Sequence, residues 1–464
     1  MHSIRFLLLF LFVVNAAFAE YKKIVVIGAG LSGLTTAYRL HELTGETVEV
    51  YEARGRAGGR VLTAYMNETH EELGGKFIND GGDALHLKAL VKEMGLEIEA
   101  YTTITTNRKY FYQGRTAPYY VPFHSWKQPD EAAYNLMQKW AQEVDNLGGL
   151  LDRFFKNNET ARHLVELHVS GYFGNPSEQL SSHYLDDFWK WYKKIYSISH
   201  NKAQNVARHD TIKGGNSQLP ENLAAALRGH VHYSHPLRKI SKTHDGKQFV
   251  LEFPNSEVVT TDYLILTLPC STLRDVNVQE GIIPDDQWHA IKTLQYGTNG
   301  VVLIGVSLGD VEKSEYSMTE DAMTWFNKTR KILTLYYGGP AGQFNSHFPE
   351  DVYKIIKDEM PALKLLFPTM KYNGKKQAMS WINEQYSKGS YCSWGVGQYE
   401  LFDEKTETLG EPVRKVFRPI DNRIFFAGEH TAIEYPTTME GAVDSGERTA
   451  RMVAKTLKKQ PQAG

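Results

Sequence analysis

Three glycines followed by a carboxylate form the clearest chemical pattern in this sequence. The apolar run at residues 24–27 leads into the turn Gly28-Ala29-Gly30-Leu31-Ser32-Gly33, and a second strand-like run, Thr47–Tyr51, ends at Glu52. In such a strand–turn–helix unit the first glycine allows the tight turn, the second admits a pyrophosphate and the third lets helix and strand pack closely. The helix N-terminus then faces the phosphates, and Glu52 can accept hydrogen bonds from a ribose. The pattern predicts a dinucleotide site.

The stretch directly after Glu52 indicates which dinucleotide is bound. It reads Glu52-Ala53-Arg54-Gly55-Arg56-Ala57-Gly58-Gly59-Arg60. Arginine offers several planar donors to phosphate oxygens, and glycine removes the side chain that would block the contact. A second chain segment that contacts the same pyrophosphate favours FAD over NAD. The alternative interpretation of this segment is a solvated basic loop that binds no ligand.

The first nineteen residues resemble an export signal. Residues 1–5 are weakly basic, residues 6–14 are apolar, and Ala17-Phe18-Ala19 forms a small-x-small cleavage site. The apolar run is too short to span a bilayer, and no later stretch is long enough, so we expect a secreted or periplasmic protein without a stable membrane anchor. With 52 basic and 54 acidic residues in the chain, the charge balance argues against nucleic acid as a partner.

Cysteine and histidine give little support for other chemistry. The two cysteines, Cys270 and Cys392, could form one disulfide, but two buried free thiols are favoured. His230, His232 and His235 are the densest histidine group, yet no cysteine or carboxylate completes a ligand set in the sequence, so we expect no metal site. Three Asn-x-Thr sequons, at Asn67, Asn158 and Asn327, matter only in a eukaryotic source.

The predicted secondary-structure pattern changes several times along the chain. Alternating strands and helices separated by glycine turns come first, helical and aromatic-rich segments follow, and strand patterns then return. Such alternation indicates an α/β protein with a discontinuous, Rossmann-like FAD-binding domain and an inserted α+β substrate domain. The predicted FAD-binding domain comprises residues 20–85, 208–289 and 381–464, and the predicted substrate domain comprises residues 86–207 and 290–380. The aromatic segment around Trp189 is interpreted as core or, less favoured, as a cavity wall.

Taken together, these segments resemble the flavin-containing amine oxidases, a family that includes monoamine, polyamine and L-amino-acid oxidases. The resemblance covers nearly all of the chain beyond residue 19. The segments that carry it are residues 28–33, Glu52, Gly58-Gly59-Arg60, Glu72-Leu73-Gly74-Gly75, residues 213–220 (KGGNSQLP), Pro236-Leu237, residues 381–386 (WINEQY), residues 425–431 (FFAGEHT) and Met439-Glu440-Gly441-Ala442.

The resemblance implies FAD as cofactor and a role for each matching residue. Glu52 would bind the adenosine ribose, Arg60 the pyrophosphate and the Leu237 backbone the adenine. Glu429 would bind the ribityl chain or pyrophosphate, and Trp381 would pack near the dimethylbenzene end. Residues 74–77 would run beside the isoalloxazine, with Thr438-Met439 under its pyrimidine edge at a helix N-terminus, which stabilises negative charge there. The candidate cofactor-binding residues are Gly28, Ala29, Gly30, Ser32, Gly33, Glu52, Ala53, Arg54, Gly59, Arg60, Gly74, Gly75, Lys76, Phe77, Leu237, Trp381, Gly428, Glu429, Thr438, Met439 and Ala442.

Three departures from the family pattern are informative. Monoamine oxidases tether the flavin through a cysteine where this chain has Ser390, so we expect non-covalent FAD. Of the two aromatic residues that flank the substrate amine in the family, Tyr391 matches one and Thr438 replaces the other, with Tyr435 as a candidate substitute; these three are the candidate catalytic residues. The family lysine that holds a water at flavin N5 aligns with Val301, which favours slow reaction with oxygen.

The family reaction transfers a hydride from the amine α-carbon to flavin N5, and the imine then hydrolyses to a carbonyl and ammonia or an amine. An amino-acid substrate would need a cationic clamp for its carboxylate, and only Lys76 lies near the expected place, so a small-molecule amine is favoured over an amino acid. Oxygen and a cytochrome- or quinone-linked carrier both stay open as electron acceptor, as does a homodimer. The alternative functions are an L-amino-acid oxidase, another flavoenzyme of the same fold, and an exported FAD-binding protein without turnover.

Overall fold

The computed structural model describes most of the chain. The described residues are 22–66, 69–119, 121–123, 128–201, 206–307, 309, 315–327 and 329–459. The predicted export signal and the sequon at Asn67 lie outside them. Among the helices within these ranges, none is long and apolar enough to cross a membrane.

A five-stranded parallel sheet forms the centre of the dinucleotide-binding part, in the order β23-β12-β1-β2-β8. All four residues of β1 are buried, as expected for a parallel sheet that is covered on both faces. The strands are β1 (Ile24–Ile27), β2 (Val48–Tyr51), β8 (Val231–His232), β12 (Tyr263–Leu266) and β23 (Ile424–Phe426).

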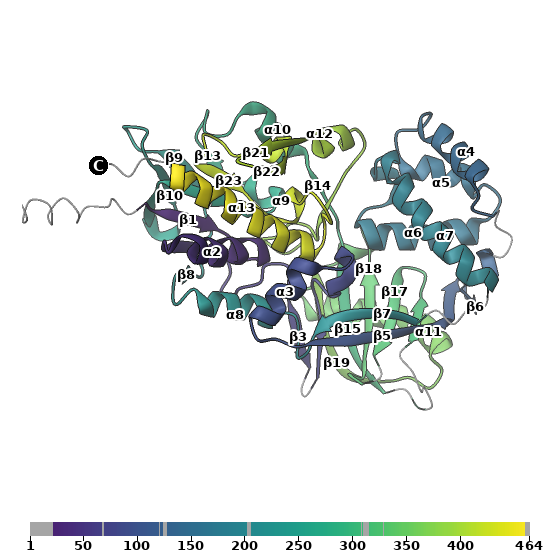
Figure 1. Cartoon of the computed structure of the whole chain (residues 1–464). Coiled ribbons are helices and arrows are strands. Elements are labelled where there is room, and N and C mark those ends of the chain that lie inside the picture. Colours follow the sequence, from purple (N-terminus) through teal and green to yellow (C-terminus); the bar gives the residue numbers. More distant parts are fainter. Residues whose placement is uncertain are drawn as a thin grey trace, which may run out of the picture.

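Helices from opposite ends of the chain cover this sheet. Figure 1 shows the C-terminal helix α13 (Met439–Lys459) lying along α2 (Leu31–Thr44), next to β1. Helix α3 (Leu85–Glu93) also packs against α13. The predicted domain boundary at residue 86 therefore falls inside a helix that belongs with the dinucleotide-binding part. Helix α8 (Gln218–Ala226) also packs against α2.

Smaller sheets and short helices lie around the central layers, and one of them, the β3–β4 pair, packs against the large sheet described below. A four-stranded sheet has the order β11-β10-β9-β13, and three two-stranded pairs are β3 with β4, β14 with β20 and β21 with β22. Their bounds are β3 (Thr63–Met66), β4 (Thr69–Glu72), β9 (Lys239–Lys242), β10 (Phe249–Glu252), β11 (Val258–Thr261), β13 (Asn277–Val278), β14 (Gln295–Tyr296), β20 (Cys392–Ser393), β21 (Lys405–Thr408) and β22 (Glu411–Arg414). The short helices are α9 (Cys270–Leu273), α10 (Asp285–Thr293) and α12 (Tyr399–Asp403).

A large sheet forms the base of the second half, in the order β19-β15-β18-β17-β16-β5-β6, with β7 also paired to β5. Its strands are β5 (Ile98–Tyr112), β6 (Arg115–Pro118), β7 (Val206–Ile212), β15 (Gly300–Ser307), β16 (Glu315–Met318), β17 (Ala322–Asn327), β18 (Ile332–Tyr337) and β19 (Lys371–Ser380). The prediction that the FAD-binding domain resumes at residue 208 is wrong. Strand β7 pairs with β5 in this sheet through residue 212. The sequence pattern of a strand predicts that the strand forms but not which sheet it joins, and this explains the error.

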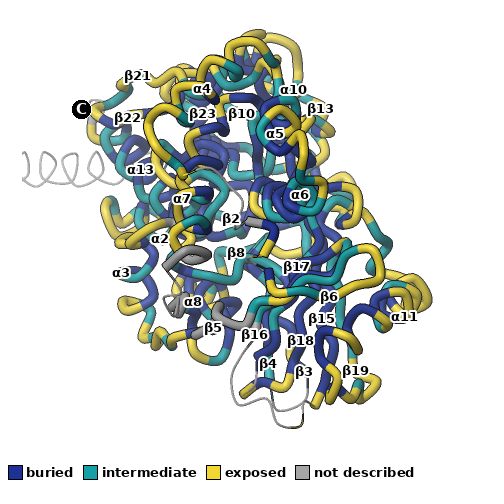
Figure 2. Tube along the Cα trace, turned by 90° about the vertical axis from the view of Figure 1, so that its right-hand side faces the viewer, coloured by how far each residue is buried: buried dark blue, intermediate teal, exposed yellow. Residues whose placement is uncertain are grey.

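Helices lie over this sheet, and polar caps set the starts of α4, α5 and α6. Asp130, Asn146 and Asn158 each accept the backbone N–H of the third residue of the following helix. Figure 2 shows α6 as a largely buried helix between its neighbours and the sheet. The helices are α4 (Glu131–Ala141), α5 (Leu147–Phe154), α6 (Glu159–Phe173), α7 (Leu185–Asn201) and, on the far side, α11 (Pro349–Leu366).

The aromatic segment of α7 serves two purposes. Trp189 and Tyr192 are buried in the hydrophobic core that α4 to α7 share, as the favoured interpretation of this segment required. Trp191 instead lines the large cavity described below. Helical periodicity explains the division, since neighbouring residues of a helix point in different directions.

Candidate active site

One cavity of about 1220 Å³ runs between the two halves of the molecule. Small-molecule pockets measure about 300–1,000 Å³, so this cavity has room for a dinucleotide and a substrate together. The structure brings most of the predicted site residues to its wall. These residues are Gly28, Gly30, Ser32, Glu52, Ala53, Arg54, Gly59, Arg60, Gly74, Gly75, Lys76, Phe77, Leu237, Trp381, Tyr391, Glu429, Thr438, Met439 and Ala442.

The glycine turn has the geometry that a bound pyrophosphate requires. A Cβ placed on Gly30 would meet no atom within 4 Å, whereas one on Gly33 would lie 2.0 Å from the Gly28 carbonyl oxygen. Gly30 therefore leaves space for a ligand, and Gly33 is needed for close packing of helix on strand. No side chain caps the N-terminus of α2, so its first N–H groups remain available to phosphate. Gly33 and Ala29 act behind the cavity wall and do not line it.

Glu52 is buried at the end of β2 and ties this turn to the arginine-rich loop. Its carboxylate accepts hydrogen bonds from the backbone N–H of Ala29 at 2.8 Å and of Arg54 at 2.9 Å. The Arg54 guanidinium pairs with Glu384 and donates to the Ser387 hydroxyl at 2.7 Å. The WINEQY motif at residues 381–386 and the loop after β2 thus meet at the same wall of the cavity.

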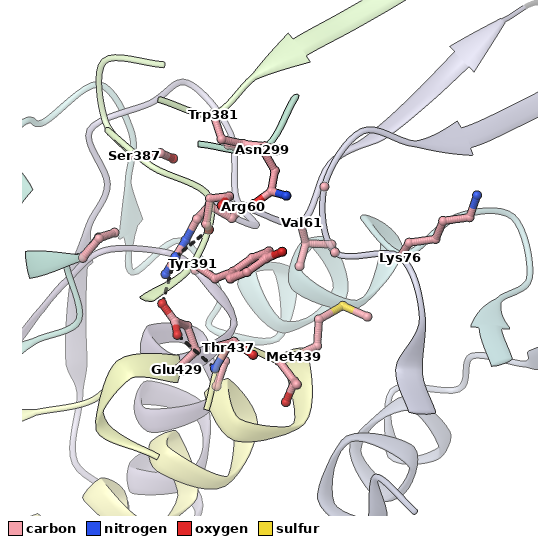
Figure 3. A pocket seen from close by; sticks show the side chains of 18 of the residues that line it. Arg60, Val61, Lys76, Asn299, Trp381, Ser387, Tyr391, Glu429, Thr437 and Met439 are labelled. Atoms are coloured by element: carbon pink, nitrogen blue, oxygen red, sulfur yellow. Dashed lines mark hydrogen bonds and ion pairs between the residues drawn. The ribbon is translucent and has the colours of Figure 1, made fainter. Parts of the chain in front are cut away.

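Arg60 and Glu429 form the polar centre of the site (Figure 3). The Arg60 guanidinium donates to Glu429 Oε1 at 2.9 Å and to the Ser390 carbonyl oxygen at 2.8 Å. Glu429 also accepts the backbone N–H groups of Cys392 at 3.2 Å and Thr437 at 3.1 Å. Burial opposes ionisation of Glu429, but the Arg60 charge and these hydrogen bonds outweigh it, so its pKa lies below the ordinary value.

Both oxygens of Glu429 are engaged by the chain itself. This carboxylate therefore positions Arg60 and the segment before α13, and any contact with the ribityl chain is additional to that role. Gly428 does not line the cavity. Its φ of +143° and the proximity of His430 to the place of a Cβ make it part of the bend that aims Glu429.

The loop at residues 74–77 places Gly75 against the start of α13, where a Cβ would lie 3.0 Å from Met439. The side chain of Lys76, however, points away from Arg60 and Tyr391 (Figure 3). Its ammonium lies 3.1 Å from Glu71 and over the rings of Tyr101 and Trp325, at 4.5 and 4.6 Å. Burial lowers the pKa of Lys76 to about 8. Lys76 is therefore neither a free clamp for a substrate carboxylate nor directed at the flavin position.

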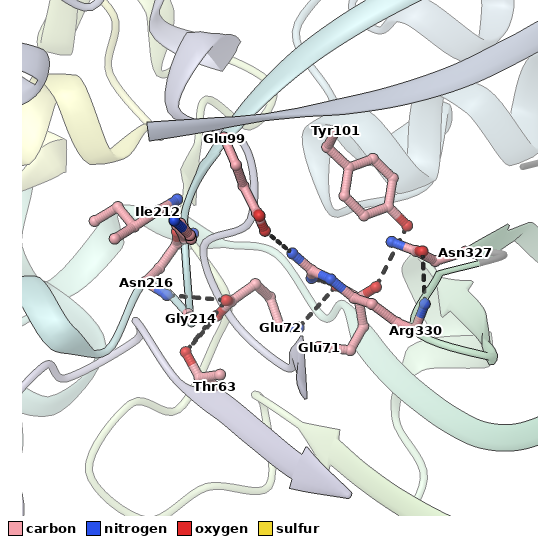
Figure 4. A network of polar contacts seen from close by, with 12 residues as sticks. Thr63, Glu71, Glu72, Glu99, Tyr101, Ile212, Gly214, Asn216, Asn327 and Arg330 are labelled. Carbon is pink, nitrogen blue, oxygen red and sulfur yellow. Dashed lines mark hydrogen bonds and ion pairs between the residues drawn. The ribbon is translucent and has the colours of Figure 1, made fainter. Parts of the chain in front are cut away.

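A buried ionic network supports this loop from behind (Figure 4). Arg330 bridges Glu71 at 3.2 Å and Glu99 at 2.6 Å. Glu72 instead accepts hydrogen bonds from the Thr63 hydroxyl at 2.9 Å and the Asn216 N–H at 3.0 Å, and burial raises its pKa to about 8. The ELGG and KGGNSQLP motifs are thus joined by a carboxyl group that is largely protonated at neutral pH.

Two tyrosines meet on the substrate side of the cavity. The Tyr391 hydroxyl donates to the Gly171 carbonyl oxygen at 2.8 Å and lies 3.2 Å from the Tyr336 hydroxyl. Tyr336 comes from β18 and was not identified from the sequence, because no local motif marks it. Only its partial exposure within an otherwise buried strand distinguishes it. Tyr336 lines the cavity beside Tyr391.

The residues expected opposite Tyr391 do not supply a second ring. Thr438 lines the cavity, but its hydroxyl donates to the Tyr435 carbonyl and accepts the Gly441 N–H, which caps α13. Tyr435 does not line the cavity and is 47% exposed. Its ring occupies the place of a Cβ at Gly82, with the hydroxyl 2.9 Å away. The suggestion that Tyr435 substitutes for the missing cage residue is therefore wrong, since the turn before α13 directs it outward.

The structure also places several further residues that the sequence analysis named. Cys270 and Cys392 are buried free thiols, as predicted. The Ser390 hydroxyl donates to Asn299 Oδ1 at 2.6 Å. Val301 lines the cavity at the start of β15, opposite Tyr336 in register. Trp381 lines the cavity and donates its indole N–H to the Leu73 carbonyl at 2.9 Å, so it is both core and wall.

The histidine cluster has a structural explanation. His230 and His232 lie 2.9 and 2.7 Å from the two oxygens of Glu49 on the neighbouring strand. His235 lies 2.9 Å from Glu257. Within the residues described, no group of three or more His, Cys, Asp or Glu side chains is arranged to hold a metal ion.

Comparison with known proteins agrees with this geometry. Residues 31–454 match the model of the flavin containing amine oxidoreductase family. Amine oxidase [flavin-containing] B of Canis lupus familiaris is 25% identical over 476 residues, covering 95% of this chain and 87% of the relative. An amine oxidase [flavin-containing] of Oncorhynchus mykiss is 26% identical over 493 residues, with the same coverage of 95% and 87%.

Two solved structures share the fold. Cyclohexylamine oxidase from Brevibacterium oxydans superposes with a TM-score of 0.73 at 19% identity, covering 94% of this chain and 100% of the other. Putrescine oxidase bound to putrescine gives a TM-score of 0.69 at 18% identity, covering 92% and 98%. The predicted α/β fold class and the prediction of FAD as cofactor are confirmed. The chain belongs to the family of flavin-containing, FAD-dependent amine oxidoreductases.

Proposed function

We propose that this protein oxidises a small amine at the carbon next to nitrogen. Bound FAD would supply the hydride acceptor for that carbon, and the imine so formed would hydrolyse to a carbonyl compound and ammonia or an amine. The observation that carries the proposal is the continuity of one cavity from the glycine turn at Gly30 to the paired hydroxyls of Tyr336 and Tyr391. The two similar structures are named as oxidases of cyclohexylamine and putrescine, and both compounds are amines.

The residues of the chain contribute orientation and a low-dielectric surrounding. Tyr391 is held by the Gly171 carbonyl and by Tyr336, so its ring presents a fixed face to the substrate. Apolar and aromatic walls exclude water, which favours the neutral amine needed for hydride transfer. Thr438 leaves more room opposite Tyr391 than a second ring would, which favours a bulky group on the amine side.

We propose that FAD is held without a covalent bond. Ser390 stands at the tethering position, and its hydroxyl is engaged by Asn299. Cys392 is 2% exposed and belongs to a hydrophobic core cluster, with its backbone N–H directed to Glu429. Neither residue offers a thiolate to the flavin ring.

We further propose that the protein is exported and passes its electrons chiefly to a redox carrier. The signal-like sequence pattern of residues 1–19 supports the proposal of a secreted or periplasmic location. Val301 cannot orient a water or donate a proton near flavin N5, which favours a dehydrogenase over a fast oxidase. Oxygen remains the alternative acceptor, and a homodimer remains an open assembly.

An anaerobic screen of amines tests the proposed activity directly. Purified holoenzyme is mixed with each amine, and the oxidised-flavin absorption band is followed. Loss of the band with at least one amine, together with carbonyl product, supports the proposal. A full amine panel that leaves the band unchanged, while dithionite reduces the same FAD, would refute it and favour an FAD-binding protein without turnover.

A further inference from the structure

The end of the cavity beyond Phe77 carries three cations and one acid. Arg108 from β5 and Lys190 and Lys194 from α7 line it, together with Asp187, which lies 3.3 Å from Lys190. Arg108 and Lys194 are the two cations that have no such partner within the described part of the chain. The Arg108 guanidinium carbon lies 4.1 Å from the centre of the Tyr316 ring, and its Nε is buried without a hydrogen-bond partner. Among the described residues, no carboxylate lies within ion-pair distance of Arg108 or Lys194. Buried or half-buried arginines are usually paired, so half-buried Arg108 offers unused N–H donors to an anion, and exposed Lys194 adds positive charge beside it.

Two neutral histidines flank these cations. The His168 ring stacks on Trp191 with centres 4.5 Å apart, and the His209 ring stacks on Phe77 at 4.1 Å. Burial, together with the charges of Arg108 and Lys194, lowers the pKa of His168 to about 3 and of His209 to about 4. Both imidazoles are therefore uncharged at neutral pH. They can exchange hydrogen bonds with a ligand, while the positive charge of this end comes from Arg108 and Lys194.

The cationic end is separated from Tyr391 by the width of several strands. Tyr336, Trp325, Tyr316 and Arg108 lie on β18, β17, β16 and β5, which are consecutive in the sheet. The ring centres of Tyr336 and Trp325 are 5.7 Å apart, and those of Trp325 and Tyr316 are 6.4 Å apart. Three strand spacings amount to about 14 Å between the strands that carry Tyr336 and Arg108. A carboxylate on the α-carbon of an amino acid cannot cover this distance.

The inner part of the cavity carries an acid instead. Asp80, at the end of the short helix η1 (Ile78–Gly81), lines the cavity. Asp80 is exposed to the cavity, and the protein around it raises its pKa to about 7 by desolvation, which the charge of Lys76 partly offsets. Asp80 lines the same cavity as Tyr336 and Tyr391. A carboxylate in this wall attracts the ammonium group of a ligand that reaches the tyrosine pair.

We propose that the substrate is an amine with an acidic group at its opposite end, the acid bound by Arg108 and Lys194 and the amine placed near Asp80 and Tyr391. Carboxylate, sulfonate and phosphate share the required chemistry, and the planar guanidinium suits a bidentate contact with each. This inference rests on the proposed amine oxidation. It excludes both α-amino acids and long diamines as preferred substrates, because the former are too short and the latter place a second cation against Arg108.

Three compounds of equal length test the preference. The holoenzyme is reduced anaerobically with an eight-carbon ω-amino acid, the matching alkylamine and the matching α,ω-diamine. We expect the ω-amino acid to have the lowest half-saturation concentration. Arg108→Gln should reduce its advantage over the alkylamine by about 10- to 100-fold, the effect of losing a charged hydrogen bond. Arg153→Gln, at an exposed arginine paired with Glu143 at 2.6 Å outside the cavity, should retain the advantage.

A binding measurement separates this inference from the proposed function. The unreactive dicarboxylate of the same length is titrated into oxidised holoenzyme, and the flavin spectrum and tryptophan fluorescence are followed. Saturable binding that weakens in Arg108→Gln and in Lys194→Gln supports the anion site even if no amine is oxidised. Amine oxidation with equal preference for all three compounds, or with preference for the diamine, overturns the inference and leaves the proposed function intact. Because Arg108→Gln and Lys194→Gln are measured separately, a folding defect in one of them leaves the other to decide the test.

Discussion

Replacing Glu359 by glutamine should remove one contribution to the pH dependence of the free energy of unfolding, and its size follows from the raised pKa of Glu359. Glu359 lies on α11, is 8% exposed, and accepts a hydrogen bond from the Tyr337 hydroxyl at 3.0 Å. Burial raises its pKa from 4.5 to about 7. A carboxyl group with a raised pKa favours folding below its unfolded pKa, and this contribution is lost as pH rises through the folded pKa. Between pH 5 and pH 8 the loss amounts to about 2.5 kcal/mol, at 1.36 kcal/mol per unit.

Urea unfolding of wild type and Glu359→Gln at both pH values measures this difference. Glutamine retains the volume and the acceptor for Tyr337 but does not ionise. The free energy of unfolding of wild type, relative to the variant, should therefore fall by about 2.5 kcal/mol from pH 5 to pH 8. Glu350→Gln, at an exposed position on the same helix, should follow the wild-type pH dependence. Parallel curves for wild type and Glu359→Gln would refute the assignment of a buried, largely protonated carboxyl.

Four further expectations follow from the site. Because Ser390 replaces the tethering cysteine, acid precipitation should release the yellow FAD into the supernatant; colour in the pellet would reveal a covalent bond. Glu52→Gln should weaken FAD retention by about 1.5–3 kcal/mol, measured by titrating apoprotein with FAD, and an unchanged affinity would contradict the ribose assignment. Tyr391→Ala should slow anaerobic flavin reduction several-fold with FAD still bound, and equal rates would disprove its place beside the substrate. Val301→Lys should speed reoxidation of the reduced enzyme by oxygen in stopped-flow mixing, and reoxidation by oxygen in wild type that outpaces turnover with an artificial acceptor would overturn the dehydrogenase proposal.

The dinucleotide half could be read from the sequence because its determinants are local. The strand, the turn and the start of the helix around Gly28 to Gly33 lie within ten residues. Glycine at position 30 leaves space for a ligand, and at position 33 a Cβ would lie 2.0 Å from the Gly28 carbonyl oxygen. Glu52 follows directly at the end of the next strand. Backbone hydrogen bonding and steric exclusion act over a few residues, so spacing in the chain records them faithfully.

The substrate half depended on tertiary structure. Strand β7 joins β5, and Tyr435 turns outward beside Gly82; neither follows from local pattern. The Lys76 ammonium contacts Glu71 and the Trp325 ring and does not point toward the centre of the cavity.

The sequence by itself determined that the chain binds FAD in a Rossmann-like fold and where its phosphate-binding turn lies. The tertiary structure alone decided which side chains line the cavity. Tyr336, Asp80 and Arg108 come from three separate elements, a strand, a short helix and a second strand, and share one cavity only because the sheet and helices pack together. Packing assembles groups distant in sequence, and the burial it creates sets charge states, as the pKa of buried Glu72, raised to about 8, illustrates. No spacing along the chain encodes either effect.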